Sequence, residues 1–542
     1  MKTICLLLPL AFLLCVSAKG QPTLLTVAEK SNYESTSTYN DVISFIEVLE
    51  QSSPYIRVET MARSIEGRDI PLLVIGNPLP QNPADLENDD RIVVYLQGNI
   101  HAGEVEGKEA TLMLARDLLA NDVSNILKNT VVLICPILNA DGNEKISTKN
   151  RTRQNGPKNG VGVRYNGQNL DLNRDAMKLE TPEIRGVVTH VLNRWDPAIS
   201  VDCHTTNGSY HEEPVTFTWM MNPNGDRNLI NYMRDKLMPL VSERLSEKYQ
   251  VDNIFYGEFI DRTNPEKGWV YSATEPRYMV NYIGLRNRLS ILNENYVYAD
   301  FETRVNGNYY LLRSILEYAS THKKEIIHLL EDADAEVIKR GLDPAITDSF
   351  AFEYKREPTP EKITIKAFEA DKYVDESGRT RYKKSDRKKT VTIFYFADYF
   401  PAKNIKFPYA YILSLSDPTI LDVIETHGIT IERLGEKTTL AVEKFNIKKL
   451  TAAERLNQGH YTNTIKGDFI AENREFPAGT YVIRTAQPLG SLAAYLLEPL
   501  ADDGLLKWNF FDRYLVPQWG KGYYPYPVYR VVGKTELRTK TD

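Results

Sequence analysis

The sequence predicts an α/β protein whose sheet is covered by helices on both faces, followed by a smaller β-rich C-terminal domain. As far as about residue 330, short apolar runs alternate with segments of helical periodicity. After about residue 345 this alternation gives way to a charged stretch over 355–390 and then to further strand-like runs. Of the 542 residues, 42% are hydrophobic and 25% are charged, which is ordinary for a soluble globular protein and argues against disorder or coiled coil.

The expected elements follow one another along the chain. We expect strands where short runs are apolar between turn signals, and helices where apolar residues recur every three to four positions. The expected strands of the first part are 91–99, 130–138, 197–204 and 288–294, and the expected helices are 104–120, 182–195, 226–249 and 304–332. The second part is expected to contain a strand over 390–400 and a helix over 419–428. We place the boundary near residue 345, which gives domains over 21–345 and 346–542.

Residues 1–20 are interpreted as a cleaved secretory signal peptide. Lys2 gives a basic start, 4–16 is an apolar run of 13 residues, and small residues follow near 18–20. A membrane-spanning helix needs about 20 apolar residues, so this run is too short to be one. A lipoprotein signal at Cys15 is disfavoured because a bulky leucine precedes it. We therefore expect an extracytoplasmic protein, periplasmic or secreted, with no membrane span.

Charge and cysteine content exclude several classes of protein. The chain has 66 basic and 72 acidic residues, and a net charge of −6 gives no reason to expect nucleic acid or an anionic membrane as partner. Only Cys135 and Cys203 remain once the signal is removed, so a scaffold held by several disulfides is excluded. Both lie in apolar strand-like runs, which favours two buried free thiols and leaves a single bridge as the alternative.

The strongest chemical signal is the sequence from His101 to Glu104, at the end of an expected strand and the start of a helix. At such a corner both side chains can turn toward one point, and zinc takes nitrogen and oxygen ligands. His204 ends another expected strand, and ligands of open α/β sheets collect beyond the carboxyl ends of the strands. These three residues form a candidate site for one Zn²⁺ ion. His211, which precedes two glutamates, is a rival ligand.

Four motifs occur in a fixed order along the chain: His101/Glu104, Asn139-x-Asp141-Gly142, Asn173-Arg174 and His204. This ordered set resembles the zinc carboxypeptidases of the M14 (carboxypeptidase A) family. The resemblance covers roughly residues 25–330 and implies a mixed, mostly parallel sheet with helices on both faces. It also implies the two-histidine, one-glutamate zinc site that carboxypeptidase A uses. A further similarity, over 476–499 and 503–512, is to the tail of a bacterial secreted branch of the family.

The resemblance implies roles for residues beyond the metal ligands. In this family an arginine after the Asn-x-Asp-Gly turn polarises the scissile carbonyl, and Arg153 is favoured for that role, with Arg151 as runner-up. Asn173 and Arg174 match the pair that grips the terminal carboxylate of the substrate, a task that suits the planar guanidinium. The ordinary structural alternative for Arg174 is a salt bridge with Asp171 or Asp175.

Glu294, at the end of a late strand, matches the general base of the family, with Glu302 as the fallback. The structural alternative for Glu294 is an ion pair with Arg286 or Arg288. Asp171 and Asp202 are candidate partners that would orient the ligand histidines. The tyrosine that caps the substrate has four candidates: Tyr271, Tyr278, Tyr282 and Tyr296.

The expected function is that of a zinc-dependent metallocarboxypeptidase, which hydrolyses C-terminal peptide bonds by means of a metal-bound water. Its partner would be a peptide substrate with a free C-terminal carboxylate. A first alternative is a zinc amidase or acylase that acts on cell-wall peptides, such as γ-D-glutamyl bonds, or on acyl-amino acids. A second is an inactive binding protein on the same fold, which the full ligand set and the candidate base argue against.

Overall fold

The computed structural model describes residues 24–120, 124–206, 208–345 and 347–541. The predicted signal peptide lies outside these ranges. None of the helices within them is both long and apolar enough to cross a lipid bilayer.

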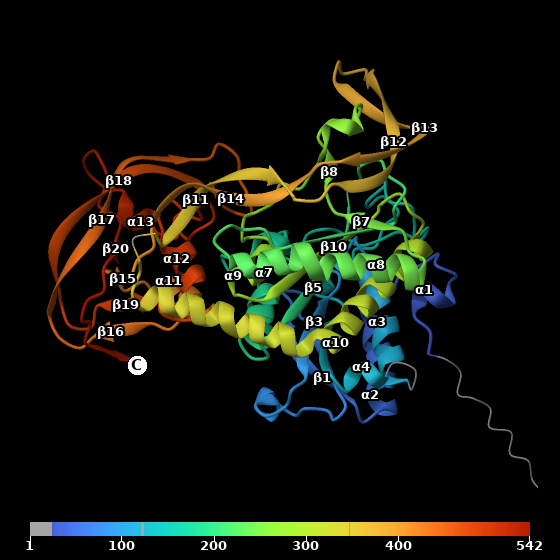
Figure 1. Ribbon diagram of the computed structural model, residues 1–542, viewed down its shortest axis with the longest axis horizontal. Coiled ribbons are helices and arrows are strands. Elements are labelled where there is room, and N and C mark those ends of the chain that lie inside the picture. Colours follow the sequence, from blue (N-terminus) through green and yellow to red (C-terminus); the bar gives the residue numbers. More distant parts are fainter. Residues whose placement is uncertain (1–23, 121–123, 207, 346, 542) are drawn as a thin grey trace, which may run out of the picture.

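An eight-stranded mixed sheet forms the centre of the first part of the chain (Figure 1). Its strand order is β1-β2-β4-β3-β5-β10-β6-β7. The central pairings β4/β3, β3/β5 and β5/β10 are parallel, and so is β6/β7, whereas the other three are antiparallel. In chain order the strands are β1 Ile56–Arg63, β2 Asp69–Ile75, β3 Ile92–Gln97, β4 Thr130–Cys135, β5 Ile199–Thr205, β6 Val215–Trp219, β7 Asn253–Phe255 and β10 Leu289–Asn295.

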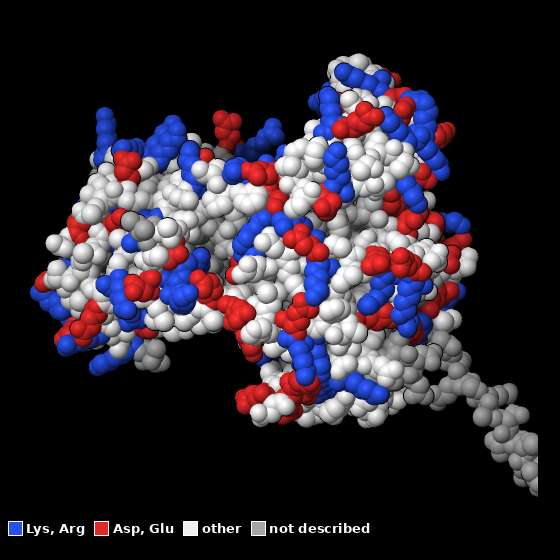
Figure 2. Space-filling model, in the orientation of Figure 1, with Lys and Arg blue, Asp and Glu red and all other residues white. Residues whose placement is uncertain are grey.

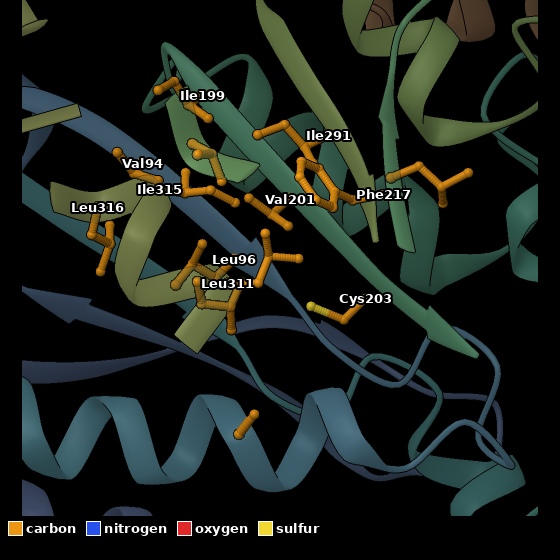
Figure 3. Packing of buried hydrophobic residues seen from close by; sticks show 14 of the residues in the cluster. Val94, Leu96, Ile199, Val201, Cys203, Phe217, Ile291, Leu311, Ile315 and Leu316 are labelled. Carbon is orange, nitrogen blue, oxygen red and sulfur yellow. The ribbon is translucent and has the colours of Figure 1, made fainter. Parts of the chain in front are cut away.

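Helices cover both faces of this sheet, because alternate residues of each strand point to opposite sides. Along β3, Val94 and Leu96 belong to one core, whereas Tyr95 belongs to another. Figure 3 shows side chains of β3, β5 and β10 gathered against Leu311 and Ile315 of α10. The predicted fold class is confirmed. The first core includes α2 (Tyr39–Ser52), α3 (Glu106–Leu119), α8 (Met238–Tyr249) and α10 (Phe301–Leu342), and the second includes α6 (Pro182–Gly186) and α9 (Met279–Leu285).

Two expected helices are interrupted in the structure. The segment 182–195 forms α6 and then a π-helical stretch over Val187–Leu192. The segment 226–249 forms α7 (Arg227–Tyr232), a π-helical stretch and α8. The helix α10 extends past its expected end at residue 332 because it goes on to contact the C-terminal part of the molecule at α12 (Gly490–Leu497).

The charged stretch after residue 345 forms long antiparallel strands. The hairpin of β12 (Ile363–Val374) and β13 (Thr380–Ile393) projects from the molecule at the upper right of Figure 1. The strand expected over 390–400 is divided at Phe394 between β13 and β14 (Tyr395–Lys406). A four-stranded sheet joins this region to the first part, in the order β11 (Ser349–Pro358), β14, β9 (Trp269–Val270) and β8 (Glu258–Phe259).

We define the C-terminal region as residues 407–541. It contains α11 (Pro418–Thr426), close to the expected helix, and a seven-stranded sheet that agrees with the predicted β-rich composition. The boundary near residue 345 falls between α10 and β11, but the division into two domains stays a prediction. In spatial order the strands are β18 Asn463–Phe476, β17 Thr438–Ala452, β20 Val528–Val531, β15 Ala410–Leu413, β19 Tyr481–Arg484, β16 Glu432–Leu434 and β21 Thr539–Thr541.

Cys135 and Cys203, on β4 and β5, are buried free thiols. Burial raises the pKa of the Cys135 thiol to about 12, so it stays protonated and unreactive at neutral pH. The alternative of a bridge between the two is wrong.

Candidate active site

His101, Glu104 and His204 meet at the carboxyl ends of two neighbouring parallel strands. His101 follows β3, Glu104 lies just before α3, and His204 is on β5, which pairs with β3. The Nδ1 atom of His204 lies 3.0 Å from Glu104 Oε2 and 3.1 Å from His101 Nδ1, and His101 Nδ1 lies 3.1 Å from the same oxygen. All three side chains are buried. Among the described residues, this is the one cluster of histidine, cysteine and acidic groups able to hold a metal ion.

The outer nitrogens of the two rings are held by carboxylates. His101 Nε2 donates to Asp171 Oδ1 at 2.9 Å, and His204 Nε2 donates to Asp202 Oδ2 at 2.8 Å. In the neutral rings these bonds place the proton on Nε2, so that Nδ1 is the atom that faces Glu104. Carboxylates in this position fix the tautomer and orientation of metal-binding histidines. The expected orienting partners, Asp171 and Asp202, therefore both contact the rings.

The electrostatics of the cluster suit a bound cation. Burial would raise the pKa of the Glu104 carboxyl, but His101 and Arg151 outweigh this effect and hold that pKa well below its usual range. Burial would lower the pKa of His204, yet Asp202 and Glu104 raise it well above its ordinary value. The three side chains thus stabilise positive charge at the point where their ligand atoms converge.

Glu294 lies beside this cluster because of strand register. On the parallel pair β10/β5, Glu294 stands opposite His204. Burial raises the pKa of the Glu294 carboxyl to about 8, with His204 opposing that rise and Glu104 adding to it. The ion pairs considered as alternatives do not form, since Arg286 bonds Asn193 and Arg288 bonds Asp196 and Asp334.

Two arginines lie close to the ligands: Arg151, which bonds Glu104, and Arg164. Arg164 was not among the candidates predicted from the sequence. Its Nη1 lies 3.2 Å from His101 Nδ1 and 3.6 Å from Glu104 Oε1, and its Nε donates to Asp171 Oδ2 at 2.8 Å. Gly162 brings this arginine into place, since a Cβ there would stand 2.5 Å from the Gly142 carbonyl oxygen. A glycine where the chain packs this closely is the one local signal that could have pointed to Arg164.

Arg153, predicted to polarise the carbonyl, is not brought to this cluster. It is exposed and lines a separate cavity with Tyr210 and Tyr298. The runner-up, Arg151, has a φ of 46°, and its guanidinium donates to Glu104 Oε1 at 2.8 Å and to the Thr205 carbonyl at 3.1 Å. Arg151 therefore already bonds the candidate ligand Glu104. The chain after Arg151 leads away from the cluster, which places Arg153 outside it.

Asn173 and Arg174 lie beside the cluster. The Asn173 side chain accepts from the backbone N–H of Met279 at 2.9 Å and approaches His204 Nε2 at 3.5 Å. Arg174 donates to the Asn173 carbonyl at 2.7 Å, and its guanidinium lies over the Tyr278 ring, 4.4 Å from the centroid. Arg174 Nη1 lies 3.8 Å from Asp171 Oδ2. This is the salt bridge considered as the structural alternative, and at this distance it leaves most of the guanidinium free.

One cavity of about 200 Å³ unites these groups. It is polar around the cluster and apolar or aromatic at its far wall. A cleft of this kind, with a few convergent polar groups, is typical of an enzyme active site. Its lining residues are His101, Glu104, Arg164, Asn173, Arg174, His204, Thr205, Tyr256, Tyr271, Ala273, Tyr278, Val280, Leu292 and Glu294.

The remaining candidates lie elsewhere. The fallback base Glu302 is exposed in the first turn of α10, and the rival ligand His211 stacks on Tyr296 with ring centroids 4.0 Å apart. Tyr282 is buried with its hydroxyl 2.7 Å from His427 Nδ1. Of the four tyrosines considered, Tyr271 and Tyr278 therefore reach the cavity.

Several known proteins are similar to this chain. Residues 42–220 match the family model described as zinc carboxypeptidase. The chain is 23% identical over 483 residues to carboxypeptidase 2 of Trichophyton tonsurans, which spans 83% of this chain and 80% of the relative. It is 27% identical over 170 residues to carboxypeptidase D of Mus musculus, which covers 30% of this chain and 12% of that one. A metallo-carboxypeptidase structure from Burkholderia cenocepacia aligns over 53% of this chain and 70% of its own, with 18% identity and a TM-score of 0.39.

The His-Glu-His cluster and these sequence matches define a metallopeptidase. Residues 42–220 therefore carry the sequence similarity to zinc carboxypeptidases that the motifs predicted.

Proposed function

We propose that this protein is a zinc-dependent metallocarboxypeptidase that removes residues from the free C-terminus of peptides. The observation that carries the proposal is the shared cavity, which holds a cluster able to bind a metal, the partly buried carboxylate of Glu294 and the guanidinium groups of Arg164 and Arg174. Each group has a separate task in hydrolysis of a terminal peptide bond. A mere binding protein would not need the Glu294 carboxylate beside the ligands.

The donor set fits one zinc ion. Two imidazole nitrogens and one carboxylate are the three protein ligands typical of catalytic zinc sites, which keep a further position open. The inward-facing Nδ1 atoms of His101 and His204, with Glu104 between them, satisfy this requirement. When bound, zinc would act as a Lewis acid on a carbonyl and lower the pKa of water.

The residues of the chain supply binding and proton transfer. Arg174 and Asn173 hold the terminal carboxylate, and the Tyr278 ring supports the guanidinium from below. Arg164 donates to the scissile carbonyl oxygen as that atom gains negative charge. Glu294 accepts a proton from the attacking water on its carboxylate and delivers it to the nitrogen of the leaving amine. Assigning this electrostatic role to Arg164 replaces the expectation for Arg153.

Several expectations from the sequence remain part of the proposal. We place the protein outside the cytoplasm on the basis of its N-terminal segment, in a bacterial branch of the family on the basis of its tail, and in two domains divided near residue 345. The partner is a peptide with a free carboxylate.

Metal analysis and peptide hydrolysis test the proposal together. We expect one zinc per chain, loss of hydrolysis on chelation and recovery on addition of zinc. Glu104→Gln weakens one ligand and should lower the bound zinc, whereas Glu302→Gln, on the surface of α10, should not. Release of amino acids from cell-wall peptides or acyl-amino acids, with no action on ordinary peptides, would contradict the proposal in favour of the amidase alternative.

A further inference from the structure

Two segments of the C-terminal region reach the active-site cavity from outside. The connection between β17 and β18 carries Gln458, whose Oε1 accepts from the backbone N–H of Asp171 at 2.8 Å. At the same turn, His460 lies 2.9 Å from the Glu180 carboxylate. These contacts join residues far apart in sequence, and they end on the segment that carries Asn173 and Arg174.

Asp171 is the point from which this wall of the cavity is organised. Its Oδ1 accepts from His101 Nε2 and, at 3.0 Å, from the backbone N–H of Asn173, while its Oδ2 accepts from Arg164 Nε. The backbone position of Asp171 therefore fixes where several groups lie. These are the ligand His101, the proposed oxyanion donor Arg164 and the proposed carboxylate-binding pair Asn173 and Arg174. Gln458 fixes that backbone through its N–H.

The neighbouring segment of the cavity wall is held by a second side chain of the same region. Asp503 is fully buried and accepts from the backbone N–H of Arg277 at 2.6 Å and from Arg277 Nε at 3.2 Å. Trp508 Nε1 donates to its other oxygen at 2.8 Å. Arg277 directly precedes Tyr278, the ring that lies beneath Arg174.

One aromatic ring lies between these two segments of the wall. The buried Trp508 has Lys178 over its face, 4.6 Å from the centroid, and the Arg277 guanidinium at 5.6 Å. We propose that the C-terminal region sets the geometry of the carboxylate-binding pocket, with Gln458 and Asp503 as positioning residues for Arg174 and Tyr278. This inference rests on the proposed function and gives the C-terminal region a part in substrate selection.

The test compares Gln458→Ala with Leu456→Ala, a matched change at a 60% exposed neighbour on the same turn. Because one hydrogen bond is lost, kcat/KM for a free-acid peptide should fall by about three- to tenfold in Gln458→Ala and not in Leu456→Ala. Hydrolysis of the matching C-terminal amide should change less than twofold. Gln458→Glu keeps an oxygen that can accept from the Asp171 N–H. It should therefore keep most of the preference for the free acid over the amide, whereas a purely structural role would not predict this recovery.

Two results separate this inference from the proposed function. If the unaltered protein releases no residue from free-acid peptides, the proposed function fails. If it does so and Gln458→Ala keeps the same ratio of free-acid to amide hydrolysis, the positioning role is wrong. Urea unfolding of each variant checks that the C-terminal region stays folded.

A separate observation concerns a cavity of about 470 Å³ beside the β12–β13 hairpin. It lies between that hairpin and the loops that follow β5 and β10. Figure 2 shows many Lys and Arg side chains, with Asp and Glu among them, on the projecting hairpin. The lining contains cations and tyrosines and no acidic side chain: Arg153, Gly208, Tyr210, Arg262, Tyr298, Tyr373, Thr380, Arg381, Tyr382, Lys383 and Lys384.

Part of this positive charge is not neutralised. Arg381 pairs with Asp375 at 2.7 Å and Arg262 approaches Glu258 at 3.5 Å. Within the described ranges, Arg153 and Lys383 form no ion pair with a carboxylate. The cavity therefore favours an anionic group, and the tyrosine hydroxyls offer further hydrogen bonds to it.

The cavity is adjacent to the active site along the chain. Thr205 lines the active-site cavity and Gly208 lines this one, so their Cα atoms are at most about 11 Å apart. Gly208 permits this arrangement, since at a φ of 85° a Cβ would stand 2.6 Å from the Tyr298 ring. An extended peptide advances about 3.3 Å per residue, so about three residues span that distance.

We infer that this cavity is a subsite for an acidic residue of the peptide substrate, about three to four residues before the scissile bond. The inference rests on the proposed function, and the occupant is the substrate because the two cavities share the loop after His204. Arg153 would then contact the substrate remote from the bond that is cleaved.

Paired peptides with Asp or Ala at that position test the subsite. Exposed ion pairs contribute modestly, so we expect the acidic peptide to be preferred by about two- to fivefold at low salt, with the preference lost in 0.5 M NaCl. Lys383→Ala and Arg153→Ala should reduce the preference. Lys389→Ala should not, because Lys389, on the same strand as Lys383, is paired with Glu266.

Three outcomes would overturn the subsite. One is equal hydrolysis of both peptides by the unaltered protein. Another is a preference that persists in Lys383→Ala and Arg153→Ala. The third is the finding that a sulfated oligosaccharide binds in the cavity and yet does not slow hydrolysis of the acidic peptide. No hydrolysis of either peptide would instead contradict the proposed function.

Discussion

Replacement of Arg174 by alanine is the perturbation whose effect the geometry specifies best. The guanidinium is held by the Asn173 carbonyl at 2.7 Å and by the Tyr278 ring, 4.4 Å from its centroid. It is therefore pre-organised before substrate arrives. Its side chain is 24% exposed, so an ion pair there is largely desolvated. Hydrogen bonds to charged groups contribute about 1.5–3 kcal/mol, which corresponds to about a 10- to 150-fold loss of kcat/KM.

The assay uses pairs of peptides that differ only in a free or amidated C-terminus. Arg174→Ala should slow hydrolysis of the free acid by that factor and leave the amide nearly unchanged. Arg174→Lys keeps the charge without the planar fork, so its loss should be intermediate. Arg185→Ala is the control, because Arg185 bonds Asp422 outside the cavity.

A parallel fall for free acid and amide would refute this reasoning, since it would mean that Arg174 supports the site without binding the carboxylate. An unchanged rate for both peptides would refute it equally. Circular dichroism and zinc content of each variant show whether the cavity is intact.

Three further predictions follow from the same structure. Glu294→Gln should retain zinc and lose at least about a hundredfold in kcat, as measured by single-turnover hydrolysis, because the proton acceptor is gone. Arg164→Ala should lower kcat for a neutral peptide by about 10²- to 10³-fold, whereas Arg153→Ala should leave it unchanged, and the reverse result would restore the expectation from the sequence. Burial lowers the pKa of His427 to about 3 from 6.5, so the unfolded chain binds the proton more tightly and folding stability is lost as pH falls below 6.5. Between pH 7.5 and 5 the free energy of unfolding of the unaltered protein should fall by about 2 kcal/mol more than that of His427→Gln in urea titrations, and equal slopes would contradict the burial effect.

Part of this site could be predicted because strand ends are marked in the sequence. His101 and His204 each follow a run of buried apolar residues, and parallel neighbouring strands bring their ends to one edge. Glu294 follows by the same logic, since its strand pairs with that of His204. For these residues local pattern and sheet topology agree, which is why the sequence could predict that they lie close together.

The arginine was not predictable from the local pattern. Arg151, Arg153 and Arg164 follow the Asn-x-Asp-Gly turn, and which of them lines the cavity depends on how the loop returns. Arg151 bonds Glu104 and Arg153 lies away from the cluster, whereas the tight packing at Gly162 brings Arg164 into the cavity lining. Nothing in the order of residues marks these features as decisive.

The β12–β13 hairpin and the contacts of the C-terminal region escaped prediction for another reason. Most residues of β13 are exposed, so most of the strand lacks the alternation of apolar and polar residues that marks a half-buried strand. The contact of Gln458 with Asp171 spans most of the chain and depends on the packing of two regions. Such long-range contacts leave no local signal.

The central claim is tested most directly by mass spectrometry of peptide hydrolysis by the zinc-loaded protein. We predict stepwise release of single residues from the free C-terminus, loss of this release with a C-terminal amide, and its absence in Glu294→Gln. Internal cleavage, release from the N-terminus, or equal hydrolysis of acid and amide would contradict the assignment of this cavity to a carboxypeptidase.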